Sequence, residues 1–141
     1  MKATLERNDL LYPELSYKIV GCAFEVFKEI GPGHLEKIYQ RALAIAFRKA
    51  GLNFIEQPRY DLNFQNERVG YGFLDFLVEE KIIVELKRGK TYLNKEVDQV
   101  VDYLKTSNLK LGIIIRFTSE GARFKRLINL PPAENILKNA S

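Results

Sequence analysis

Asp75, Glu85 and Lys87 are the residues of this chain whose types and spacing could hold a metal ion and move a proton. Glu85 and Lys87 are two residues apart, so their side chains share one face if this segment is a strand. Asp75 interrupts an apolar run, and a carboxylate in such a run needs a partner because burying it alone is costly. The three residues therefore mark a candidate centre on two neighbouring strands.

A turn between the two segments would bring the carboxylates together. Glu79-Glu80-Lys81 is consistent with a three-residue turn, which would pair Val78 with Ile82. Counting outward from this pair places Asp75 directly opposite Glu85. Directly opposed residues have Cβ atoms about 4.5–5.5 Å apart. Two carboxylates at that separation repel each other, and a divalent cation that bridges them removes the repulsion.

These side-chain types are the ones that phosphodiester hydrolysis requires. A cation held by carboxylates polarises the phosphate and acidifies a water, and a nearby ammonium can orient that water or balance the developing charge. The alternative is structural, with Asp75 at a bulge and with Glu85 and Lys87 as an exposed ion pair. The apolar stretch Ile82-Ile83-Val84 weakens this alternative, because it is typical of a central strand, where charged residues are unusual.

Apolar spacing predicts the helices that position this centre. Residues 13–30 and 34–50 repeat apolar residues at intervals of three and four, which is typical of amphipathic helices. Gly31 and Gly51 follow these patterns and are expected to end the helices. A third helix is predicted at residues 94–106. In the second helix, the residues expected to face inward are Ile38, Ala42, Ile45 and Ala46.

The strands are predicted from a period of two and from apolar runs. They are expected at residues 60–64, 69–78, 82–87, 109–117 and, at an edge, 123–130. The first alternates as a half-buried strand does, and residues 109–117 are apolar enough for a buried central strand. This order of elements predicts an α/β fold with a mixed β-sheet flanked by helices.

The length and composition are those of one globular domain. The chain has 141 residues, of which 46% are apolar and 28% charged, so we expect a single domain over residues 1–141. Its core should span about residues 12–130, with a tail at 131–141. No apolar run reaches the roughly 20 residues of a membrane span. Because Cys22 is the only cysteine, no intrachain disulfide can form, and we expect a cytoplasmic protein.

Composition also limits the metal and the partner. One histidine and one cysteine cannot by themselves make a Cys/His zinc site, so oxygen ligands and therefore Mg²⁺ or Mn²⁺ are expected. Residues 81–126 carry a net charge of +6, and the rest of the chain carries −2. A polyanion such as nucleic acid is therefore a plausible partner, and a solvated surface of mixed charge is the alternative. A protein partner or a homo-oligomer is left open.

Three motifs in one order resemble the PD-(D/E)XK nuclease superfamily. Asp75 followed by Glu85-Leu86-Lys87 after a hairpin is similar to its catalytic motif. Gln99-Val-Val-Asp-Tyr103 resembles the Q-x-x-x-Y motif of RecB-type members. Upstream, Gly33-His-Leu-Glu36-Lys-Ile-Tyr39 resembles the signature of the small bacterial family named GxxExxY. Leu74 stands where the superfamily name has Pro, a position that varies among members.

The resemblance implies a restriction-endonuclease-like three-layer core and a metal-dependent nuclease acting on DNA or RNA. In this scheme Asp75 and Glu85 are metal ligands, together with the carbonyl of Leu86. Lys87 positions or activates the water. Glu36 is a further ligand, directly or through water.

Three other motif residues have structural alternatives. The resemblance implies that Gln99 and Tyr103 support the site or contact substrate. Tyr103 could equally be a core residue whose hydroxyl needs a partner, whereas a buried Gln99 amide is harder to explain as core. Glu36 could simply interact with a helix dipole. For the whole chain, the alternative to a nuclease is a non-catalytic module that binds nucleic acid or protein.

Overall fold

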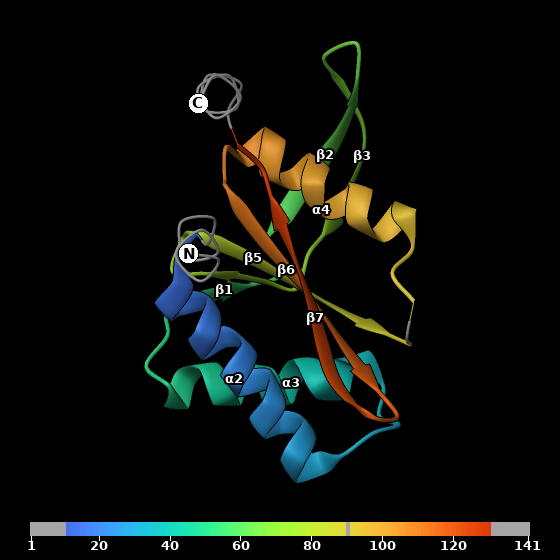
Figure 1. Cartoon of the computed structure of the whole chain (residues 1–141). Coiled ribbons are helices and arrows are strands. Elements are labelled where there is room, and N and C mark those ends of the chain that lie inside the picture. Colours follow the sequence, from blue (N-terminus) through green and yellow to red (C-terminus); the bar gives the residue numbers. More distant parts are fainter. Residues whose placement is uncertain (1–10, 90, 131–141) are drawn as a thin grey trace, which may run out of the picture.

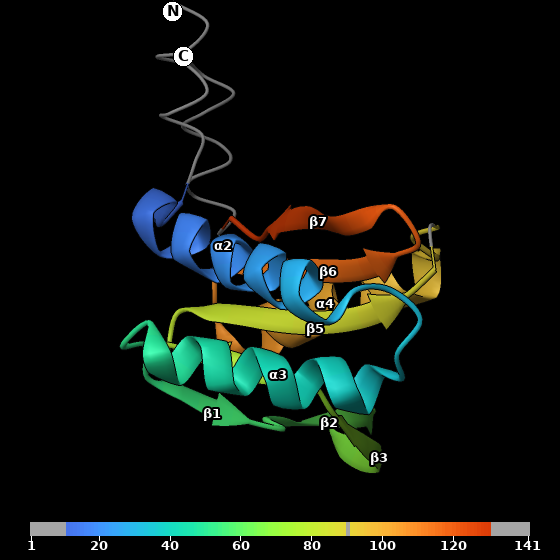
Figure 2. The ribbon, with the colours of Figure 1, turned by 90° about the horizontal axis from the view of Figure 1, so that it is seen from below.

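The computed structural model describes residues 11–89 and 91–130, which fold into three layers (Figure 1). A five-stranded sheet in the order β1-β4-β5-β6-β7 forms the middle layer. Helices α2 (Pro13–Ile30) and α3 (Glu36–Lys49) cover one face, and α4 (Asn94–Ser107) covers the other (Figure 2). The predicted α/β fold, with a mixed sheet flanked by helices, is confirmed. The predicted tail at 131–141 lies outside the described residues.

The strands of this sheet are β1 (Phe54–Glu56), β4 (Phe76–Val78), β5 (Ile82–Arg88), β6 (Leu111–Thr118) and β7 (Gly121–Ile128). β5 and β6 are parallel, because α4 returns the chain to the same end of the sheet between them. The other neighbouring pairs are antiparallel. Every residue of β6 is buried, which confirms the buried central strand. β7 is the predicted edge strand, whereas β1 was not predicted.

Two apolar clusters hold the layers together, and their members show which face of the sheet each β5 side chain occupies. Val84 and Leu86 belong to the cluster that joins the sheet to α2 and α3. Ile83 belongs to the cluster that joins the sheet to α4. Because side chains alternate along a strand, Glu85 and Lys87 lie on the α4 face with Ile83. The candidate centre is therefore on the α4 side of the sheet.

The prediction of one strand over residues 69–78 is wrong. β2 (Arg59–Phe64) and β3 (Glu67–Phe73) form a separate two-stranded sheet, and the chain bends at Asp75 before β4 begins. The bend is held by the backbone: the N–H of Leu74 donates to Pro58 at 3.0 Å, and the carbonyl of Asp75 accepts from Gln57 at 2.9 Å. Asp75 therefore lies at the junction of the two sheets.

Two predictions of burial are also wrong. Residues 60–64 are not a half-buried strand, since Leu62 and Phe64 are exposed on the separate hairpin. On α3, Ile38 and Ile45 are exposed. The buried residues of that helix are Tyr39, Leu43, Ala44 and Phe47. The face that carries Tyr39 is buried because it brings a large aromatic surface to the sheet. The ring of Tyr39 stacks on Phe117 with centroids 4.0 Å apart.

Candidate metal centre

The hairpin between β4 and β5 sets the position of the two carboxylates. Val78 pairs with Ile82 around the turn at residues 79–81, which confirms the predicted turn and register. Continuing this register outward brings Asp75 opposite Glu85, as expected from the sequence. Backbone φ is positive at both Glu79 and Glu80, which is the geometry of a tight hairpin turn.

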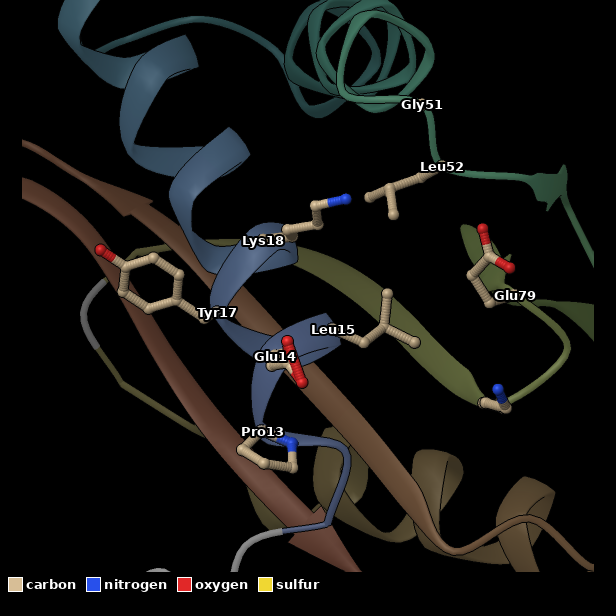
Figure 3. Close-up of a pocket in the computed structure, with 9 residues that line it drawn as sticks. Pro13, Glu14, Leu15, Tyr17, Lys18, Gly51, Leu52 and Glu79 are labelled. Atoms are coloured by element: carbon tan, nitrogen blue, oxygen red, sulfur yellow. The ribbon is translucent and has the colours of Figure 1, made fainter.

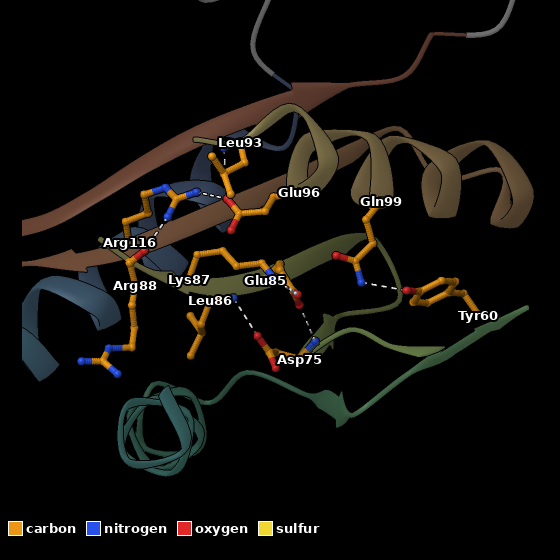
Figure 4. Close-up of polar contacts among 10 residues, drawn as sticks. All are labelled: Tyr60, Asp75, Glu85, Leu86, Lys87, Arg88, Leu93, Glu96, Gln99 and Arg116. Atoms are coloured by element: carbon orange, nitrogen blue, oxygen red, sulfur yellow. Dashed lines mark hydrogen bonds and ion pairs between the residues drawn. The ribbon is translucent and has the colours of Figure 1, made fainter. Parts of the chain in front are cut away.

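Two hydrogen bonds and an ion pair fix the side chains of the centre (Figure 4). The N–H of Asp75 donates to Oε1 of Glu85 at 3.0 Å. The N–H of Leu86 donates to Oδ2 of Asp75 at 2.7 Å. This contact uses the amide of Leu86, whereas the expected metal ligand is its carbonyl. Nζ of Lys87 lies 3.1 Å from Oε2 of Glu85. The three residues that were expected to form the centre therefore meet in the structure.

Burial makes the carboxylate pair costly to ionise. Glu85 is 4% exposed, and burial together with the charge of Asp75 raises the pKa of Glu85 to about 8. Burial also raises the pKa of Asp75, although the hydrogen bond from Leu86 opposes this. Burial disfavours the charged form of Lys87, but the charge and hydrogen bond of Glu85, together with the charges of Glu36 and Glu96, outweigh it, so the pKa of Lys87 is raised. An added cation would relieve the cost of placing the buried Glu85 carboxylate beside the half-buried Asp75 carboxylate.

Glu36 is the first residue of α3 and lies within electrostatic range of the centre. Burial raises the pKa of Glu36; the charge of Lys87 lowers it and that of Asp75 raises it. Within residues 11–89 and 91–130, no three His, Cys, Asp or Glu side chains form a ready-made cation cage. Asp75 and Glu85 are thus an opposed pair of oxygen donors that could hold a cation, and Glu36 does not form a cluster of three with them.

Gln99 and Tyr103 of α4 come together at Tyr60 of β2 rather than at the carboxylates. Nε2 of Gln99 donates to the Tyr60 hydroxyl at 2.8 Å, and the rings of Tyr103 and Tyr60 meet edge to face with centroids 6.3 Å apart. Tyr103 is also buried in the α4 cluster. Tyr60 was not predicted as a residue of the site. The available signal was Gly72 inside a predicted strand, since such a glycine can mark a close approach; in the structure a Cβ there would lie 2.5 Å from the Tyr60 hydroxyl.

A cavity of about 840 Å³ lies at the other end of β5 (Figure 3). Its lining comes from the start of α2, from the segment after α3 and from the β4–β5 turn. Lys81, which lines it, directly precedes β5, whereas Lys87 is next to the last residue of that strand. The candidate metal centre is therefore separate from this cavity.

The family assignment agrees with the geometry. A family model described as the PD-(D/E)XK nuclease superfamily matches residues 13–127. The chain belongs to the PD-(D/E)XK nuclease superfamily. The match includes both strands of the candidate centre and all of α3 and α4. The match identifies the superfamily but does not distinguish the GxxExxY or Q-x-x-x-Y groups within it.

Other comparisons support the fold alone. No curated protein matches the chain. The solved structure of SSO0001 is similar to it, with a TM-score of 0.55 and 16% identity over 74% of this chain. The similar region spans 55% of SSO0001. In the part of the chain that the structure describes, no helix is long and apolar enough to cross a membrane.

Proposed function

We propose that this PD-(D/E)XK superfamily member is a metal-dependent nuclease that hydrolyses phosphodiester bonds of DNA or RNA. The observation that carries the proposal is the pair Asp75–Glu85: Glu85 is buried, Asp75 is half-buried, and the two carboxylates are fixed opposite each other beside Lys87. Two opposed carboxylates that are largely removed from water destabilise a fold unless a proton or a cation neutralises part of their charge. Binding of a metal ion would supply this neutralising charge and would explain why the two carboxylates lie together.

The roles follow from the donors that the chain offers. Asp75 and Glu85 would hold Mg²⁺ or Mn²⁺ with the carbonyl of Leu86, and Glu36 would join directly or through a water. A divalent cation, when bound, polarises the phosphate and makes a water more acidic. Lys87 would orient that water and balance negative charge as the phosphate is attacked. The ion pair with Glu85 supports this role, because it holds the ammonium beside a carboxylate that would bind the metal.

We also propose that the chain belongs to the GxxExxY group and uses the Q-x-x-x-Y motif in the manner of RecB-type members. Tyr39 supports this because its hydroxyl donates to the carbonyl of Gly31 at 2.6 Å, which ties the loop before α3 to the helix that carries Glu36. Gln99 supports it from α4, because its partner Tyr60 lies on the hairpin that leads directly into Asp75.

One observation favours the alternative of a module that binds nucleic acid without cutting it. Among the described residues, two carboxylates lie together, and no third side chain of a type that binds metals completes a cluster with them. Such a module would bind nucleic acid with strong salt dependence. It would not cleave the nucleic acid, whichever divalent metal ion is added.

The test is cleavage of plasmid DNA and of single-stranded DNA and RNA oligonucleotides with Mg²⁺ or Mn²⁺. The variants Asp75→Ala, Glu85→Ala and Lys87→Ala should each abolish cleavage. Lys49→Ala, which alters an exposed lysine in the last turn of α3, is the matched control and should cleave normally. Cleavage that persists in all three site variants would exclude this centre. Salt-sensitive binding without cleavage would favour the non-catalytic module.

A further inference from the structure

Arg116 of β6 is the largest of the fully buried side chains in residues 11–89 and 91–130, with 1% of its surface exposed. Burying a guanidinium is costly, and an apolar side chain of similar volume often replaces a buried ion pair with no loss of stability. Ile114, two residues earlier on the same face of β6, is buried in the α4 cluster, so an apolar side chain fits this face of the strand. Packing alone therefore does not explain an arginine here.

The contacts of Arg116 join the segments that surround the candidate centre (Figure 4). Its Nη1 donates to the carbonyl of Arg88, the last residue of β5, at 2.8 Å. Its Nη2 pairs with Oε1 of Glu96 in the first turn of α4. Cζ lies 4.4 Å from the ring centroid of Tyr92, in the loop between β5 and α4. In the register of β5 and β6, Arg116 is also the partner of Lys87.

Glu96 connects Arg116 to the chemistry of the centre. The side chain of Glu96 is only 18% exposed, and its carboxylate also accepts a hydrogen bond from the N–H of Leu93 at 3.2 Å. Its negative charge acts on both the ammonium of Lys87 and the carboxylate of Glu36. Glu96 is thus a mostly buried anion whose negative charge reaches the ammonium that pairs with Glu85.

We propose that Arg116 is a positioning residue for the candidate centre: by holding Glu96, it keeps Lys87 paired with Glu85. This inference rests on the proposed function. Without the guanidinium, the carboxylate of Glu96 loses its ion pair, and Lys87 is a cation already within its electrostatic reach. An ammonium shared between Glu96 and Glu85 would leave the position from which it can orient a water at the metal.

The test compares Arg116→Met with the double variant Arg116→Met/Glu96→Gln. The single variant should lower kcat for Mn²⁺-dependent plasmid nicking by about 10–100-fold, the range for groups that support metal ligands, with a smaller change in KM. The double variant should recover most of the lost kcat, because the competing charge is gone. A purely structural clamp would show no recovery, since the contacts with Arg88 and Tyr92 are still missing.

Two further variants control for folding. Arg126→Met removes a partly buried arginine that donates to the carbonyl of Leu11 at 2.7 Å, and it lies on the face of β7 away from α4. It should lower the melting temperature and leave kcat unchanged. Arg116→Lys keeps a cation beside Glu96, so its kcat should lie between those of the wild type and Arg116→Met. It provides the comparison if Arg116→Met does not fold.

The outcomes separate the two proposals. Wild-type protein that neither binds Mn²⁺ in calorimetry nor nicks plasmid would overturn the proposed function, and this inference with it. Wild-type protein that nicks, with Arg116→Met at wild-type kcat, would overturn the inference alone, and so would Arg116→Lys at wild-type kcat if Arg116→Met does not fold. A folded double variant that is as slow as Arg116→Met would also overturn the inference alone.

Discussion

The N–H of Asp75 donates to Oε1 of Glu85 at 3.0 Å, although ten residues separate them in the chain. This contact exists because Asp75 lies in a bend between β3 and β4 and not inside a continuous strand. Leu86, which follows Glu85, returns the contact by donating to Oδ2 of Asp75 at 2.7 Å. Each carboxylate thus accepts a hydrogen bond from a backbone amide of the opposite segment. These two hydrogen bonds orient both carboxylates.

Replacement of Lys87 should separate catalysis from metal binding. Lys87→Met should lower the rate of metal-dependent cleavage by at least about 100-fold, the cost of removing one group that stabilises charge in a transition state. Its Mn²⁺ affinity should be unchanged or higher, because Glu85 loses the cation that competes for its oxygen. Lys87→Arg should not rescue the rate, since a planar guanidinium is larger and cannot lose its proton. A Lys87→Met variant with no Mn²⁺ binding would instead indicate a structural lysine.

The metal-free protein should become less stable as pH rises. Burial raises the pKa of Glu85 from an ordinary 4.5 to about 8, so between these values the folded state binds more protons than the unfolded state. The free energy of unfolding should therefore fall from about pH 4.5 to about pH 8. Urea denaturation in a chelating buffer at several pH values measures this slope. Glu85→Gln should flatten it, and an equally steep slope in that variant would assign the titration to another group.

Manganese should reverse this pH dependence. A cation binds the deprotonated pair, so the rise in melting temperature on adding Mn²⁺ should grow as pH increases over the same range. Asp75→Asn keeps an oxygen that can accept from Leu86 but removes one negative charge. Without metal at pH 8 it should be more stable than the wild type by about 0.5–2 kcal/mol, and it should lose the response to Mn²⁺. A lower stability in that variant would mean that the Asp75 charge is favourable without a metal.

Much of the centre can be predicted from the sequence because its geometry is local. A three-residue turn fixes the register of two consecutive strands, and that register alone places Asp75 opposite Glu85. The strand break could not be predicted in this way. No glycine or proline lies at residues 73–78, and the bend is made by backbone contacts with Gln57 and Pro58.

Contacts between distant elements were not predictable for a different reason. Gln99 is 39 residues from Tyr60, and Arg116 is 20 residues from Glu96. The apolar period of α4 shows which face of the helix is buried, but it does not show which strand lies opposite each turn. The face of α3 was misjudged because Ile38 and Ile45 have the same helical spacing as the buried residues.

Tyr60→Phe should test the link between α4 and the β2–β3 hairpin. It removes the hydroxyl that accepts from Gln99 and leaves the amide without that partner. The expected loss of stability is about 0.5–1.5 kcal/mol, typical of one hydrogen bond. Tyr71→Phe, which alters an exposed tyrosine on the same hairpin, is the control and should change little in urea denaturation. Equal effects of the two variants would argue against a specific link.

Gly112→Ala should test how closely α4 packs on β6. A Cβ at Gly112 would lie 2.7 Å from Cγ1 of Val100, so the helix would have to shift. Overpacking of this kind costs about 1–3 kcal/mol. Gly21→Ala is the matched control, because a Cβ on this α2 glycine meets nothing within 4 Å. That variant should gain up to about 1 kcal/mol from helix propensity. A neutral Gly112→Ala would indicate a looser interface.

The position of a bound ion tests the central claim most directly. Crystals soaked in Mn²⁺, with anomalous diffraction data, should show one strong peak between the carboxylates of Asp75 and Glu85, with Glu36 on the same side. Crystals of Glu85→Gln, treated in the same way, should lose that peak. A wild-type crystal with Mn²⁺ bound only elsewhere, or with no peak at these carboxylates, would contradict the assignment of a metal centre.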